Sequence, residues 1–130
     1  MSLTNKVTAE DILRISGVDA SRCMQCGKCS GACPNYGEMD LHPHQFPALI
    51  RKDRITELME SNAIYLCLSC FACSQRCPRG VEPAKLIEAV RLSVIRQKGQ
   101  NHMTADALPA KLDSAIPQQA LVSAMRKYSK

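Results

Sequence analysis

The sequence predicts a mostly α-helical fold in which short helices are separated by loops that contain cysteine. Three observations support this prediction. No stretch of useful length alternates apolar and polar residues as a half-buried strand does. The stretch 83–99 places apolar residues at the spacing of one helix face. Eight cysteines in 130 residues are typical of a small domain held together by metal or disulfide bonds, because so short a chain has limited room for an apolar core.

The first expected helix follows Thr8–Asp11, which fits a capping box, and ends at Gly17. Its apolar stripe is formed by Ile12, Leu13 and Ile15. Residues 35–40 are polar and turn-like. Two further short helices are expected at 48–51 and at 53–60, the latter with an apolar face of Ile55, Leu58 and Met59.

The clearest helix begins at Pro83, a residue that suits the first helical position, and is expected to end at Gly99. Its apolar stripe consists of Leu86, Ile87, Val90 and Val94. A last helix at 118–128 is marginal on its own because isolated helices of that length are unstable in water. We therefore expect a domain at 1–99 and a C-terminal tail at 100–130 that binds a partner.

Composition favours metal over disulfide bonds as the role of the cysteines. The first residues are polar and acidic and lack the apolar core of a secretory signal, and no stretch is apolar enough to span a membrane. We therefore expect a cytoplasmic protein, in a compartment where thiols stay reduced. The net charge of +5 treats the cysteines as neutral, whereas thiolate ligands of a metal centre are negatively charged. We therefore expect the basic residues to form an ordinary solvated surface rather than a nucleic-acid interface.

All eight cysteines fall into two motifs of identical spacing, C-x-x-C-x-x-C-x-x-x-C-P, at 23–34 and 67–78. Three thiolates that are two residues apart on a tight turn can reach three corners of an iron–sulfur cube. In two-cluster ferredoxins the fourth cysteine of such a run ligates the other cluster. The sequence therefore predicts two 4Fe–4S clusters. The ligands expected for cluster 1 are Cys23, Cys26, Cys29 and Cys77, and those for cluster 2 are Cys67, Cys70, Cys73 and Cys33.

Zinc is the main alternative, but zinc sites favour two separated C-x-x-C pairs, and three cysteines within seven residues match that pattern poorly. A radical enzyme would leave one iron open, whereas four cysteines are present in each motif. With every iron bound by a thiolate, no position is open for a substrate. We therefore assign no catalytic residue and expect the clusters to pass electrons.

Other residues near the motifs have weaker claims. Ligation or proton transfer by His42 and His44 is conceivable, but cysteine already supplies all the ligands. Arg79 is expected to offset cluster charge. Phe71 and Met24 are interpreted as side chains that shield the clusters from solvent.

The stretch from Cys67 to Val81, which includes Cys-Pro-Arg-Gly-Val, resembles the iron–sulfur subunit of the heterodisulfide reductases that is called HdrC, and so does the first motif. The resemblance covers about residues 8–99. It implies an α-helical ferredoxin fold. It also implies a partner, an HdrB-like subunit with a Cys-Cys-Gly catalytic cluster, to or from which electrons pass. The electron donor would be a flavin-containing HdrA-like subunit or another donor.

The chain itself has no Cys-Cys-Gly motif, so it is expected to be a non-catalytic subunit of an oxidoreductase complex. Three alternatives stay open. One is a free-standing, diffusible dicluster ferredoxin. Another is the iron–sulfur subunit of a succinate- or glycolate-type dehydrogenase, although the chain lacks the cysteine set of a 2Fe–2S cluster. The third is a binding module in which the clusters are purely structural.

Overall fold

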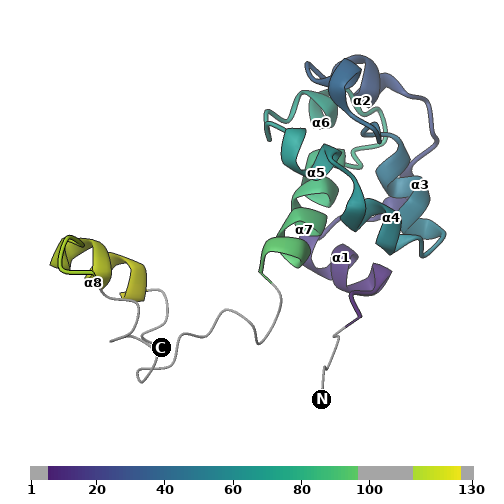
Figure 1. Ribbon diagram of the computed structural model, residues 1–130. Coiled ribbons are helices and arrows are strands. Elements are labelled where there is room, and N and C mark those ends of the chain that lie inside the picture. Colours follow the sequence, from purple (N-terminus) through teal and green to yellow (C-terminus); the bar gives the residue numbers. More distant parts are fainter. Residues whose placement is uncertain (1–5, 97–112, 127–130) are drawn as a thin grey trace. The chain divides into compact units, whose positions relative to one another are not determined.

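The computed structural model describes residues 6–96 and 113–126. The chain forms two compact units, residues 1–97 and 98–130. The described residues contain helices and turns and no strand, which confirms the predicted mostly α-helical fold (Figure 1). The domain boundary expected at residue 99 lies outside the described residues.

The elements of the first unit follow one another with short connections (Figure 1). They are α1 (Ala9–Ser16), η1 (Ala20–Arg22), α2 (Lys28–Gly31), η2 (Tyr36–Glu38), α3 (Gln45–Arg51), α4 (Ile55–Glu60), α5 (Ala63–Leu66), α6 (Ala72–Arg76) and α7 (Pro83–Ile95). The second unit contains α8 (Gln118–Arg126).

Helix α1 has the predicted capping box. The Thr8 hydroxyl accepts a hydrogen bond from the Asp11 N–H at 3.2 Å, and the Asp11 carboxylate accepts one from the Thr8 N–H at 3.2 Å. Gly17 ends the helix with φ 66°, as expected. The prediction for Ile15 is wrong, because this side chain is 45% exposed. The face of α1 that turns to the core runs through Ala9, Ile12, Leu13 and Ser16.

Helices α3 and α4 differ from the prediction at their first residues. Helix α3 begins at Gln45, earlier than expected, and Phe46 on its first turn is fully buried. Helix α4 begins at Ile55, because Asp53 has φ 53° and cannot continue a right-handed helix. As predicted, Ile55 and Leu58 face the core.

Helix α7 is the centre of the first unit and packs against α1, α3, α4, α5 and α6. Pro83 occupies its first turn, and Leu86, Ile87 and Val90 are fully buried, as the stripe predicted. The helix ends at Ile95, where the Arg96 N–H donates to the Leu92 carbonyl at 2.8 Å. It therefore ends before Gly99, at the point where the buried stripe stops; Ile95 is already 54% exposed.

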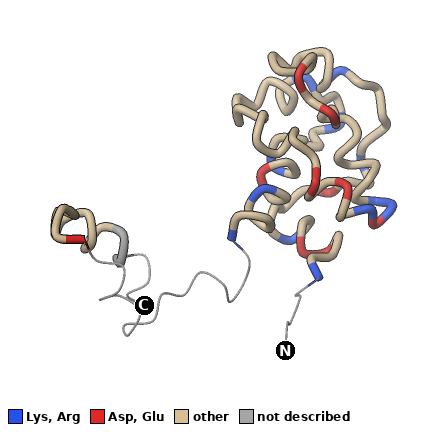
Figure 2. Tube along the Cα trace, in the orientation of Figure 1, with Lys and Arg blue, Asp and Glu red and all other residues tan. Residues whose placement is uncertain are grey.

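In the second unit, Pro117 immediately precedes α8. The helix expected at 118–128 is confirmed for Gln118–Arg126, and Tyr128 lies outside the described residues. Over the first unit, basic and acidic residues are interspersed along the chain (Figure 2). The solvated surface expected from the composition stays a prediction.

Candidate metal centres

The two cysteine motifs fold into loops of the same conformation. Each loop begins where a short helix ends. The Cys23 N–H donates to the Ala20 carbonyl at 3.3 Å, and the Cys67 N–H donates to the Ala63 carbonyl at 3.0 Å. The backbone angles of the two cysteines agree closely, with φ −68° and ψ 123° for Cys23 and φ −64° and ψ 119° for Cys67. The repeat in the sequence is thus also a repeat in three dimensions.

Two left-handed residues shape each loop, one on either side of its second cysteine. They are Gln25 (φ 58°) and Gly27 (φ 78°) in the first loop, and Ser69 (φ 53°) and Phe71 (φ 61°) at the equivalent positions of the second. A glycine takes this conformation without steric cost, whereas a large aromatic residue does not. The second loop therefore contains local strain that the sequence did not reveal.

The third cysteine of each motif lies on the short helix that follows. Helices α2 and α6 pack against each other, and Cys29 and Cys73 on them are both 7% exposed. Together with Ala84 they form a small apolar cluster, against which Phe71 packs. Burial raises the pKa of both thiols. The second cysteine of each motif, Cys26 or Cys70, is exposed instead.

The eight cysteines line two cavities of similar size. One, with about 340 Å³ of space that is partly open to solvent, is lined by Cys33, Cys67, Cys70 and Cys73. The other, with about 320 Å³, is lined by Cys23, Cys26, Cys29 and Cys77. We call the cavity with Cys23 the first cavity and the cavity with Cys67 the second.

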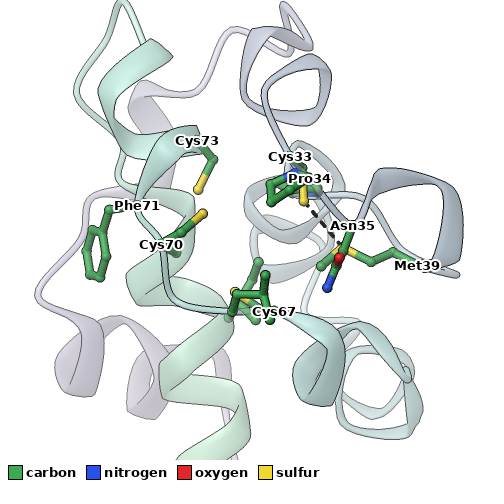
Figure 3. A pocket seen from close by; sticks show the side chains of 12 residues that line it. Cys33, Pro34, Asn35, Met39, Cys67, Cys70, Phe71 and Cys73 are labelled. Carbon is green, nitrogen blue, oxygen red and sulfur yellow. Dashed lines mark hydrogen bonds between the residues drawn. The ribbon is translucent and has the colours of Figure 1, made fainter.

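Each cavity thus gathers three cysteines of one motif and the fourth cysteine of the other. In the second cavity, Cys70 and Cys73 lie on one wall and Cys33 on the opposite wall (Figure 3). The sulfur atoms of Cys70 and Cys73 point into the space between the walls (Figure 3).

Each loop is fixed by an arginine from elsewhere in the chain. Arg51 on α3 donates through Nη1 to the Cys23 carbonyl at 3.2 Å. Arg91 on α7 donates through Nη2 to the Cys67 carbonyl at 2.7 Å, and through Nε to the Ile64 carbonyl. The same backbone group is therefore held in both loops. Sequence reasoning missed both arginines, since a helical arginine carries no local sign of the carbonyl that it will reach.

Polar groups also reach the cysteine sulfurs. The Gln25 side chain donates to the Cys23 sulfur at 3.0 Å and to the His44 carbonyl at 2.9 Å. The Val81 N–H donates to the Cys77 sulfur at 3.3 Å. Hydrogen bonds of this kind tune metal–thiolate centres.

Comparison with known proteins identifies the domain that these loops form. Residues 19–81 match the family model of a 4Fe-4S dicluster domain. The C subunit of a ferredoxin:CoB-CoM heterodisulfide reductase from Methanosarcina mazei is 34% identical over 110 residues, which are 82% of this chain and 66% of the relative.

The chain is a homologue of the C subunits of heterodisulfide reductases. The C subunit of a ferredoxin/F420H2-dependent CoB-CoM heterodisulfide reductase from Methanosarcina acetivorans is 33% identical, over 66% of this chain and 53% of the relative. The C subunit of an H2:CoB-CoM heterodisulfide,ferredoxin reductase from Methanothermobacter thermautotrophicus is 32% identical, over 68% of this chain and 46% of the relative. The chain therefore spans between about half and two thirds of the length of these curated relatives.

The cofactors of this HdrC homologue are two 4Fe–4S clusters, as the sequence predicted. The donor set fits them, because each cavity offers four cysteine sulfurs. Next to Cys73, the Ser74 hydroxyl is buried and lies at the Cys73 thiol, where it opposes the rise in pKa that burial causes. Among those residues, no group of three or more His, Cys, Asp or Glu is placed to hold a single metal ion.

The two histidines have different surroundings. His44 lines the first cavity, and its Nδ1 lies 2.7 Å from the Ser30 hydroxyl. Burial, with a contribution from the nearby His42, lowers the pKa of His44. The His42 ring stacks on Tyr36 with centroids 4.0 Å apart.

Within the described ranges, no helix is long and apolar enough to cross a membrane.

Proposed function

We propose that this HdrC homologue relays electrons through its two clusters to or from the catalytic HdrB-like subunit of a heterodisulfide reductase-like complex. The observation that carries the proposal is the pair of four-cysteine cavities, which share the apolar contact of Cys29 with Cys73. Electrons can pass between clusters whose ligands are in contact, and no third redox group is needed between them.

We assign the cysteines as the spacing predicted. Cluster 1 is held by Cys23, Cys26, Cys29 and Cys77, and cluster 2 by Cys33, Cys67, Cys70 and Cys73. The lining of the two cavities supports this assignment, since each group of four faces one cavity.

Each cluster has one side that a redox partner can approach. At the first cavity, Cys26 is exposed and the neighbouring Met24 is 60% exposed. At the second cavity, Cys70 is exposed and Leu68, the counterpart of Met24, is 65% exposed. Exposed apolar side chains beside a redox centre suit a docking partner. This arrangement supports a relay in which the donor meets one cluster and the acceptor meets the other.

The conversion of substrate belongs to the HdrB-like subunit in this proposal. Four thiolates per cluster occupy every iron, so the chain passes electrons and forms no bond to a substrate. The electrons come from a flavin-containing HdrA-like subunit or another donor. We place the complex in the cytoplasm, where eight cysteine ligands stay reduced.

Copurification tests the proposal. The chain, isolated anaerobically at low salt from native extracts, is expected to carry a subunit with a Cys-Cys-Gly motif. Deletion of residues 104–130 is expected to abolish this association, while the clusters remain. The purified chain alone should transfer electrons to dyes and should not reduce a heterodisulfide.

A chain that runs as a monomer without a partner would instead support a free-standing ferredoxin. A flavin dehydrogenase partner without Cys-Cys-Gly would support the succinate- or glycolate-type alternative.

A further inference from the structure

The two cavities have matching cysteines and different polar surroundings. Besides its cysteines, the first cavity is lined by Gln25, His44 and Arg79. In the lining of the second cavity, Asn35 is the one polar residue apart from the cysteines, and its amide donates to the Leu66 carbonyl at 2.6 Å. No charged residue lines the second cavity in the described part of the chain. Two clusters with the same ligands therefore meet different electrostatic environments.

Gln25 makes the most direct difference. Its amide donates to the Cys23 sulfur at 3.0 Å, and the same nitrogen is anchored by the His44 carbonyl at 2.9 Å. The counterpart of Gln25 in the second loop is Ser69, and the counterpart of Cys23 is Cys67. Within residues 6–96, no side chain donates a hydrogen bond to the Cys67 sulfur.

Arg79 adds a positive charge at the same cavity. It follows Cys77-Pro78 directly, lines the cavity and is exposed. Reduction adds one electron to a cluster and makes it more negative by one charge, without making or breaking a bond. Hydrogen-bond donors and positive charge stabilise that reduced state, and an apolar surrounding disfavours it.

We propose that Gln25 and Arg79 give the cluster held by Cys23, Cys26, Cys29 and Cys77 the higher reduction potential of the two, so that a single electron in the chain resides there. The inference rests on the proposed cysteine assignment. It adds to the proposed relay by naming the cluster on which a single electron resides. Neutral donors at Cys73 oppose it, namely the Ser74 hydroxyl and N–H and the Ala84 N–H. The first cluster has comparable donors, the Ser30 hydroxyl and N–H at Cys29 and the Val81 N–H at Cys77. The Gln25 amide and the Arg79 cation therefore remain as the difference between the two cavities.

Potentiometric titration of the purified, cluster-loaded full chain, followed by electron paramagnetic resonance, tests the proposal. The electron comes from dithionite and is exchanged through viologen mediators. Gln25→Leu is expected to lower the higher of the two midpoint potentials and to leave the lower one in place. Gln25→Glu is expected to lower it further, because a carboxylate replaces the donor with negative charge. Arg79→Gln should act in the same direction, with an effect that shrinks as salt is added.

Ser69→Leu is the matched control, since it changes the equivalent residue of the other loop and should leave the higher potential unchanged. Cys26→Ser and Cys70→Ser mark the signals of the first and the second cluster, because a serine ligand alters the spectrum of the cluster it binds. The proposal is overturned if Gln25→Leu leaves the higher potential unchanged. It is also overturned if the cluster with the higher potential is the one whose spectrum Cys70→Ser alters. Neither result depends on a partner protein, so either would leave the relay itself standing.

Discussion

At the scale of single residues, backbone conformation decides how each loop wraps its cluster. Three of the non-glycine residues with positive φ, Gln25, Ser69 and Phe71, lie inside the cysteine motifs. Strain of this kind is kept where surrounding interactions hold it in place, and here the expected metal–thiolate bonds can do so. Phe71 also packs on the apolar cluster of Cys29, Cys73 and Ala84. The contact between the two inner cysteines is thereby shielded from water.

Two glycines of the first loop, Gly27 and Gly31, provide a test of this view, because alanine is expected to speed the loss of iron at only one of them. Gly27 has φ 78°, and a Cβ there would meet no atom within 4 Å, so Gly27→Ala changes backbone strain alone. We expect it to cost about 1 kcal/mol. Loss of iron from cluster 1 to a ferrous chelator should then be about fivefold faster. Gly31 is helical, so Gly31→Ala should slow the loss or leave it unchanged. Equal acceleration by both variants would contradict the role of backbone strain.

At the scale of elements, helix α7 and the cysteine loops depend on each other. Arg91 on α7 is held partly buried, and it binds the carbonyls of Ile64 and Cys67 at the start of the second loop. Arg51 on α3 is exposed and binds only the Cys23 carbonyl, at the longer distance of 3.2 Å. The central helix therefore positions the second loop more firmly than α3 positions the first.

This difference predicts unequal effects when each arginine is removed. Arg91→Met deletes two hydrogen bonds from a charged donor in a partly buried site, and we expect it to destabilise the protein by about 2 kcal/mol. Arg51→Met deletes one exposed bond and should cost less than about 1 kcal/mol. On exposure to chelator, Arg91→Met should lose cluster 2 before cluster 1, as followed by electron paramagnetic resonance. Arg91→Lys should rescue only in part, because an ammonium lacks the planar fork. Equal lability of both clusters in Arg91→Met would count against this role.

The elements also show which parts of the fold the sequence could predict. Helices α1 and α7 carry caps and stripes that depend only on nearby residues, so their first residues were predicted correctly. Helices α2, α5 and α6 have four or five residues, too few to show a periodic pattern. Ile15 was misplaced because a short apolar run fits more than one helix face. For the site, the two cavities group the cysteines in the same sets of four that the spacing predicts as ligands. The contacts of Gln25 with His44 and of Arg91 with Cys67 could not be predicted, because these partners lie far along the chain.

At the scale of the whole first unit, the proposed cysteine assignment would make the clusters connect its two halves. The cavity lined by Cys23, Cys26 and Cys29 also contains Cys77, and the cavity lined by Cys67, Cys70 and Cys73 also contains Cys33. Each cluster would therefore bind segments that lie on either side of α3 and α4. Assembly of the clusters and folding of the unit are then one coupled process.

Four serine variants test this exchange of the fourth cysteines. If the assignment holds, Cys77→Ser alters the electron paramagnetic resonance signal of the same cluster as Cys26→Ser, although the two residues belong to different motifs. Cys33→Ser likewise alters the signal that Cys70→Ser alters. The physical reason is that a serine ligand changes only the cluster to which it is bound. Each variant is measured anaerobically, with iron and acid-labile sulfide determined in the same samples; about eight of each are expected in the parent protein. If Cys77→Ser instead alters the same signal as Cys70→Ser, each motif binds its own cluster and the two halves are not linked through iron. Each pair of variants combines the second cysteine of one motif with the fourth cysteine of the other. General damage to folding would alter the signals of both clusters in a single variant, and this result differs from either pairing.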